Sequence, residues 1–209
     1  MSDAPAELWP WIVIAGLGVY HGVNPAMGWL FAVALGLHRG SRRVVALSLV
    51  PIALGHLGAV AAVVAAFLLL GQVVDRTLLA RLAAGALIGW ALWHALRGHR
   101  GRPLVGLQTG LLGLAAWSFV MAGAHGAGLM LIPALLPLCT GPLPQATGAS
   151  VLPALGALGL HTAAMLATIA AVSLAVYHWL GVDFLRRGWI NLDLVWTGAL
   201  VVCGIFLLM

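Results

Sequence analysis

Charged residues are scarce in this chain, and their scarcity excludes a soluble globular protein. Of its 209 residues, 7% are Asp, Glu, Lys or Arg, whereas 63% are hydrophobic. A soluble domain carries about 25% charged residues, so this composition is that of an integral membrane protein. Lysine is absent, and all ten Lys or Arg positions are arginines, which we expect in or next to loops. We therefore expect no soluble domain and no nucleic-acid partner.

Cysteine and catalytic motifs are also nearly missing. The chain has two cysteines, Cys139 and Cys203, and no CxxC spacing, so no thiolate metal site or redox pair is predicted. The sequence contains no nucleophile–base–acid series and no phosphate-binding loop, which argues against a soluble-type enzyme, and we assign no catalytic residue. The N-terminal segment MSDAPAELWPW is acidic and has no cleavage site before the first hydrophobic run. No removable signal peptide is predicted.

Long hydrophobic runs make up most of the chain. A helix needs about 20 apolar residues to cross the hydrocarbon core of a bilayer. Six stretches meet this requirement, at roughly 9–37, 44–70, 78–97, 106–138, 149–180 and 189–209. The first, fourth and fifth are over-long and contain proline and glycine, so we predict that they are tilted or broken. The predicted fold is an all-α integral membrane protein with six transmembrane helices.

The arginines predict the orientation of these helices. The loops after the first, third and fifth stretches contain Arg39, Arg42, Arg43, Arg97, Arg100, Arg102, Arg186 and Arg187. Cytoplasmic loops are enriched in arginine and lysine, so these loops are expected in the cytoplasm and both termini outside. The prediction is a multi-pass protein of the plasma membrane, which in a bacterium is the inner membrane, with the lipid bilayer as its partner.

Four histidines lie inside the hydrophobic stretches and form two matched pairs. His21 and His125 are each followed by glycine and are 104 residues apart. His56 and His161 are 105 residues apart, and each follows a proline in a similar context. An ionisable side chain at membrane depth costs several kcal/mol unless it has a partner, so by default it indicates a functional site.

The two offsets predict an internal duplication within a single membrane domain, residues 1–209. Repeat one covers about 9–97 and repeat two about 106–209, and Gly85-Ala-Leu-Ile in the first resembles Gly198-Ala-Leu-Val in the second. Because each repeat has three spans, the second enters the membrane from the opposite side. This gives a 3+3 inverted repeat with broken first and fourth helices, in which the substrate site lies near the midplane between the repeats. We predict that all four histidines line this site as metal ligands.

The segment His21–Gly28 is the densest motif. Pro25 has no N–H, so the carbonyl of His21 is predicted to lose its helical partner. Asn24 lies three residues from His21 and is expected on nearly the same helix face. Met27, and Met130 in the second repeat, are possible soft ligands, with core packing as the alternative. We predict a substrate pathway lined by Asn24, Pro25, Met27 and Met130.

A six-span inverted repeat with a broken first helix resembles the lysine-exporter superfamily of small transporters. The segment around His21 is most similar to the nickel/cobalt branch, whose second helix carries His-Ala-x-Asp-Ala-Asp-His. On this chain the first His of that motif falls on His21, the first Asp on Asn24, the second Asp on Ala26 and the last His on Met27. The resemblance implies a metal-ion transporter. Loss of both carboxylates favours a softer ion such as Cu(I) over nickel or cobalt.

Three functions remain open from the sequence. The preferred one is a secondary transporter of a transition-metal ion, either a soft or borderline ion such as copper, or nickel or cobalt. Proton binding by the histidines would be one way to couple transport to a gradient. The alternatives are a membrane-embedded metalloenzyme or haem protein that uses the same histidines as ligands, and an exporter of a small polar organic solute. A homodimer is compatible with each of them.

Overall fold

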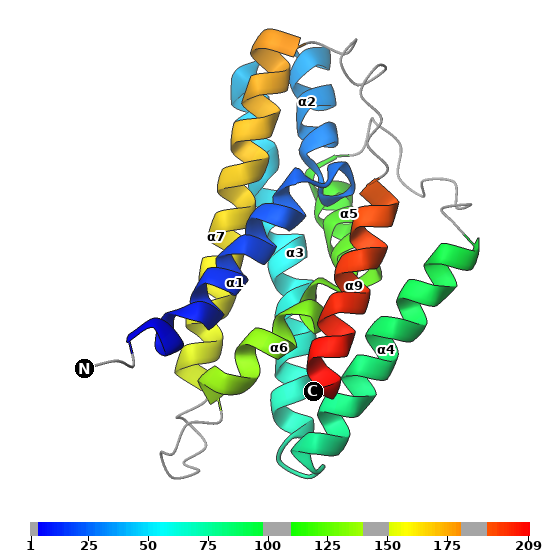
Figure 1. The fold of residues 1–209 in the computed structure, drawn as a ribbon. Helices are drawn as coiled ribbons and strands as arrows, with labels where there is room; N and C mark the ends of the chain where they lie inside the picture. Colours follow the sequence, from blue (N-terminus) through cyan, green and yellow to red (C-terminus); the bar gives the residue numbers. More distant parts are fainter. Residues whose placement is uncertain (1–3, 98–109, 140–150, 181–191) are drawn as a thin grey trace.

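The structure is a computed structural model that describes residues 4–97, 110–139, 151–180 and 192–209 (Figure 1). All regular elements in these ranges are helices, which confirms the all-α prediction for the described residues. The order is α1 (Ala4–Val23), η1 (Pro25–Met27), α2 (Trp29–His38), α3 (Arg42–Leu70), α4 (Arg76–Arg97), α5 (Leu111–Ala124), α6 (Ala127–Cys139), α7 (Val151–Ala175), η2 (Val176–Leu180) and α9 (Leu192–Leu208). The orientation prediction depends partly on Arg100, Arg102, Arg186 and Arg187, which lie outside the described residues.

Three described helices are long and apolar enough to cross a membrane: Arg42–Leu70, Thr77–Leu96 and Val151–Trp179. The pair α5 and α6, bent by 60° at its break, makes a fourth if it counts as one span. These lengths and compositions fit a membrane protein. The described residues thus contain three or four candidate spans rather than the predicted six, because breaks divide two of the predicted stretches and the described part of α9 is short.

The predicted breaks in the first and fourth stretches are both present. Each contains a glycine with positive φ, 118° at Gly28 and 67° at Gly126. A side chain is strained in this region of backbone space, so glycine suits both positions. The fifth stretch has no comparable break, because Pro153 lies in the first turn of α7, where a missing N–H breaks no helical hydrogen bond.

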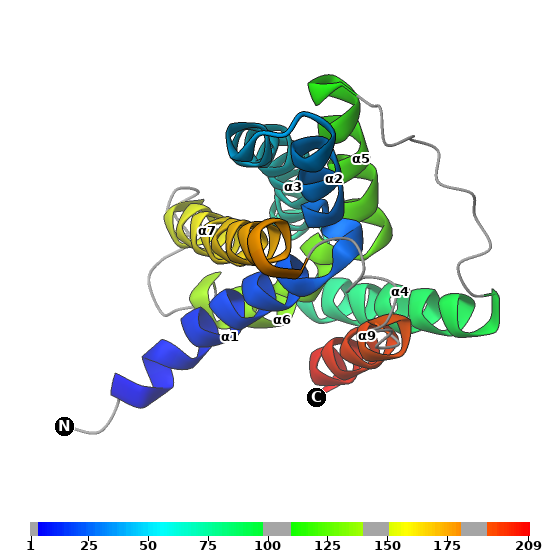
Figure 2. The same ribbon diagram turned by 90° about the horizontal axis from the view of Figure 1, so that it is seen from above.

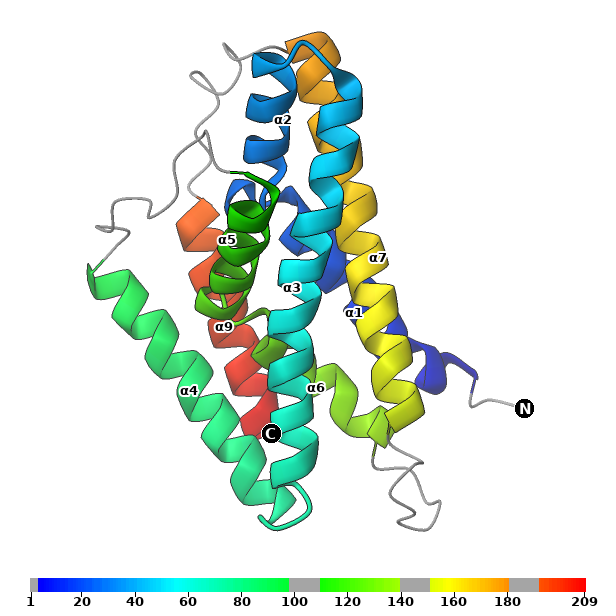
Figure 3. The same cartoon turned by 180° about the vertical axis from the view of Figure 1, so that it is seen from behind.

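The helices pack mainly in three pairs: α1 along α7, α3 along α5, and α4 along α9. The view from above shows the α1–α7 and α3–α5 pairs side by side, joined where α3 contacts α7, with the α4–α9 pair to one side (Figure 2). Seen from behind, α3 runs between α5 and α7 (Figure 3). Helix α3 therefore contacts both halves of the chain.

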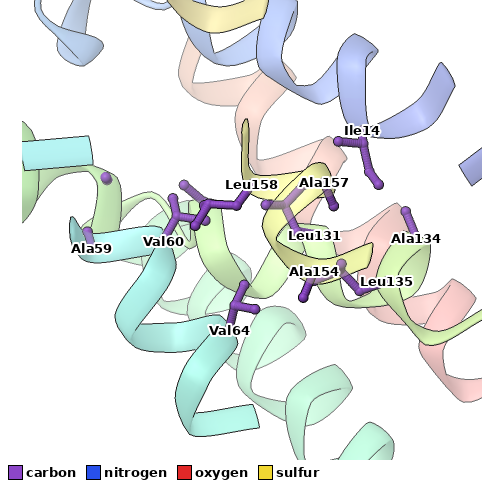
Figure 4. Close-up of a cluster of buried hydrophobic side chains, with 12 residues drawn as sticks. Ile14, Ala59, Val60, Val64, Leu131, Ala134, Leu135, Ala154, Ala157 and Leu158 are labelled. Atoms are coloured by element: carbon purple, nitrogen blue, oxygen red, sulfur yellow. The ribbon is translucent and has the colours of Figure 1, made fainter. Parts of the chain in front are cut away.

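Three apolar clusters hold the described helices together. The first joins α1, α3, α6 and α7 and includes Ile14, Val60, Leu131 and Leu158 (Figure 4). The second lies where α2 and η1 meet α3, α5 and α7, and the third lies between α4, α6 and α9. Polar side chains enclosed between such clusters cannot reach water, so their contacts must come from one another or from backbone groups.

A buried histidine trio as the candidate functional site

Three of the four predicted histidines come together at the centre of the helix bundle. His21 lies in the last turn of α1, His56 in α3 and His161 in α7, and their exposed fractions are 1%, 0% and 0%. His56 is equidistant from Arg42 and Leu70, the ends of α3. It is therefore about 21 Å along the helix from either end, at 1.5 Å per residue. We call His21, His56 and His161 the histidine trio.

The rings of the trio are in mutual contact. The ring centres are 5.8 Å apart for His21 and His56, 5.2 Å for His21 and His161, and 5.4 Å for His56 and His161. The Nε2 atoms of His56 and His161 are 3.2 Å apart, which is hydrogen-bonding distance. Three helices that are distant in the sequence thus contribute one ring each to a single cluster.

Backbone carbonyls determine where two of the rings carry their protons. Nδ1 of His21 lies 2.8 Å from the carbonyl oxygen of Leu17, and Nδ1 of His161 lies 3.3 Å from that of Ile14. A carbonyl oxygen only accepts, so each Nδ1 must donate a hydrogen, and each neutral ring then presents a lone pair at Nε2. His56 must therefore donate from its Nε2 to His161. Nε2 of His21 and Nδ1 of His56 have no hydrogen-bond partner.

The spacing of the trio suits a metal ion, although its donor atoms do not converge. Imidazoles that share one ion at about 2.0–2.1 Å have ligand nitrogens roughly 3.3 Å apart and ring centres roughly 5 to 5.5 Å apart. The trio's ring centres, 5.2–5.8 Å apart, are close to this. Among the described residues, however, no three His, Cys, Asp or Glu side chains are placed so that they could hold one metal ion. Binding by all three rings requires them to rotate and the bond between His56 and His161 to break.

His125, the fourth predicted ligand, lies apart from the trio. Its Nδ1 bonds to the carbonyl of Met121 at 2.9 Å, just as His21 bonds one turn back to Leu17. Its ring, however, packs against Trp196 of α9, with the ring centres 5.0 Å apart. The rings of His21, His56 and His161 contact one another, whereas the ring contact described for His125 is with Trp196. The matched positions in sequence therefore do not give matched surroundings.

The predicted pathway residues have structural roles in this arrangement. The Asn24 side-chain oxygen accepts the N–H of Ala26 at 3.0 Å and caps η1, in which Pro25 is the first residue. The His21 carbonyl loses its helical partner at Pro25, as predicted, but it is not free, because the chain tightens and the Asn24 N–H bonds to that carbonyl at 3.2 Å. Met27 and Met130 are 1% and 0% exposed and pack in the second and third apolar clusters.

The other described histidines do not belong to the trio. His38 ends α2 and His178 lies on η2, and both are exposed, whereas His94 packs against Trp196 with ring centres 4.4 Å apart. The trio is therefore the candidate site. Comparison with protein-family models, with curated proteins and with solved structures finds no match for this chain. Its function is inferred from the geometry of the trio.

Three tryptophans that were not among the predicted site residues support the helix breaks. At the first break, Trp29 Nε1 donates to the carbonyl of Val23 at 2.9 Å. At the second, Trp90 of α4 donates to Ala124 at 2.6 Å and Trp196 of α9 donates to His125 at 3.0 Å. A helix break frees carbonyls that hydrocarbon cannot satisfy, and indole N–H groups supply the missing donors. A tryptophan in the interior of a span was the available signal in the sequence.

Trp196→Phe is expected to lower stability without changing the metal affinity of the trio. Phenylalanine keeps an aromatic ring beside His125 but removes the hydrogen bond to its carbonyl, which costs about 1–3 kcal/mol for a buried acceptor. Thermal unfolding in detergent measures this loss. Trp179→Phe is the control, since Trp179 is 84% exposed. Equal melting temperatures for the two variants would show that the Trp196 hydrogen bond does not support the break.

Proposed function

We propose that this chain is a secondary membrane transporter that carries a transition-metal ion through the histidine trio. The observation that carries this proposal is the trio itself, three fully buried imidazoles from three helices with ring centres 5.2–5.8 Å apart. An unpartnered nitrogen is costly to bury, and Nε2 of His21 is such an atom. A cation would supply the partner that this lone pair lacks.

The hydrogen bonds behind the rings also favour a metal ion. Histidines that ligate metals usually donate their other N–H to a carboxylate or a backbone carbonyl, which fixes the ring and makes the ligating nitrogen more basic. His21 and His161 both have this arrangement, to Leu17 and Ile14 respectively. An organic solute would not require two imidazoles to be held in the same tautomer.

Helix pairing supports transport through a six-span inverted repeat. A two-fold axis that exchanges α1 with α5 and α3 with α7 would carry the α1–α7 pair onto the α5–α3 pair. It would also leave α4 packed on its counterpart α9, and these are the three principal pairs observed. In inverted repeats the substrate site lies near the midplane, and discontinuous helices line it. This agrees with the central position of His56 in α3, and it extends the resemblance to the lysine-exporter superfamily.

Tight helix packing favours a small transported ion over a fixed haem. A Cβ at Gly22, next to His21, would lie 2.6 Å from Thr168 Cβ and 2.7 Å from the carbonyl oxygen of Met165. Helices α1 and α7 are therefore in backbone contact beside the trio, where a porphyrin would have to fit. We place this transporter in the plasma membrane, with the arginine-rich loops in the cytoplasm and both termini outside.

Uptake into proteoliposomes tests the proposal. The wild-type chain is expected to move a transition-metal ion down its gradient into liposomes that contain a metal-sensitive dye. His56→Ala is expected to stop this movement. His178→Ala is the matched control, because His178 is exposed on η2. Wild-type protein that moves no ion from a panel of Cu+, Ni2+, Co2+ and Zn2+ would contradict the proposal.

A further inference from the structure

Building on the proposed function, we propose that the trio selects a soft monovalent cation, Cu+ or its analogue Ag+, over divalent transition-metal ions. Charge, donor type and donor number each lead to this choice. All three arguments concern the trio, so the inference rests on the proposed function, in which the trio binds the transported ion.

Charge is the first argument. Asp75 is the single carboxylate among the side chains that the structure describes, and it is exposed and caps the N–H of Leu78 at the start of α4, at 2.9 Å. The trio therefore offers neutral imidazoles and no described counter-charge. The cost of moving an ion out of water rises with the square of its charge, so a divalent ion costs about four times as much as a monovalent ion of equal size. The site as described favours a single positive charge.

Donor type is the second argument. With Nδ1 donating to backbone, His21 and His161 present neutral nitrogen lone pairs. Imidazole binds copper well, whereas magnesium, calcium and manganese prefer oxygen donors. Alkali-metal ions also prefer oxygen, so low charge does not make the trio a sodium or potassium site. The donors thus restrict the monovalent candidates to soft ions.

Donor number is the third argument. The Asn24 oxygen is used in capping η1, and Met27 and Met130 pack in apolar clusters. The trio is left with three rings, each able to supply one nitrogen donor. His56 supplies its donor once its hydrogen bond to His161, with 3.2 Å between the two Nε2 atoms, is broken. Cu+ and Ag+ are stable with two or three ligands, whereas Ni2+ and Co2+ prefer higher coordination numbers. Few donors in a buried site therefore favour the monovalent ions.

Equilibrium metal binding to the purified full-length chain in detergent tests this inference. Under anaerobic, reducing conditions we expect one Cu+ or Ag+ per chain, bound at least about tenfold more tightly than Zn2+, Ni2+ or Co2+ because of the charge penalty. X-ray absorption of the Ag+-loaded wild-type protein is expected to show a shell of nitrogen neighbours without sulfur. This second measurement needs no variant, so it does not depend on whether a histidine variant folds.

The outcomes separate this inference from the proposed function. The selectivity would be overturned if a divalent ion bound at the trio as tightly as Ag+, while the proposed metal transport would stand. Binding at the trio would be shown by its loss in His161→Gln and its retention in His178→Ala. Sulfur in the Ag+ shell would also overturn it, because the trio contains none. The absence of binding by any of the ions would overturn both.

Discussion

Replacing His161 by alanine is expected to abolish metal binding, whereas replacing His125 by alanine is expected to leave it nearly unchanged. The His161 ring contacts both other members of the trio, and its Nε2 lies 3.2 Å from the Nε2 of His56. Losing a residue that merely supports a metal ligand costs about 10–100-fold in affinity, so losing a ligand is expected to cost about 100-fold or more. The measurement is metal affinity by competition with a chelator.

The His125 variant makes this a test of position as well as of residue type. Both histidines are buried, at 0% exposure for His161 and 4% for His125, and both have an Nδ1 bonded to a carbonyl. His125→Ala removes the packing against Trp196, so it is expected to lower stability by about 1–3 kcal/mol. Its folded fraction should still bind the ion. Equal loss of affinity in the two variants would indicate a four-histidine site and would contradict the trio.

The position of His125 is the part of the candidate site that the sequence did not predict. The matched histidines predicted one site for all four rings, of which the structure brings together His21, His56 and His161, and the interrupted stretches predicted both helix breaks. They did not predict that the fourth ring would face α9. When the third helices are aligned on Gly85 and Gly198, Trp196 corresponds to Ala83. A large indole in the second predicted repeat and a methyl group at the aligned position of the first give His125 and His21 different surroundings.

The role of Asn24 at the first helix break could not be predicted either, because it depends on local backbone geometry. The distance from His21 to Asn24 suggested a shared helix face, but that spacing holds only while the helix continues. Pro25 ends it, and the extended backbone of Asn24, with φ −68° and ψ 122°, directs its side chain to cap η1. A polar residue before proline has two competing uses, and local hydrogen bonding decided between them.

Gly18→Ala and Gly22→Ala are expected to unfold the α1–α7 pair and with it the trio. A Cβ at Gly18 would collide with the carbonyl oxygen of His161 and would lie 2.9 Å from Ala164 Cβ. Gly18 and Gly22 are four residues apart, the small-residue spacing that lets membrane helices approach closely. Because backbone atoms cannot yield as a flexible side chain can, we expect a loss of about 3 kcal/mol or more for each variant.

Gly16→Ala is the matched control in the same helix, because a Cβ at Gly16 meets nothing within 4 Å. There alanine improves helix propensity by about 1 kcal/mol, so this variant should be as stable as the wild type or more stable. Thermal unfolding in detergent compares the three variants, and Ag+ binding reports whether the trio persists. The same packing allows Ile14 of α1 to accept the hydrogen bond from His161, 3.3 Å away. If all three variants melt together, α1 does not pack this closely on α7, and His21 cannot share a site with His161.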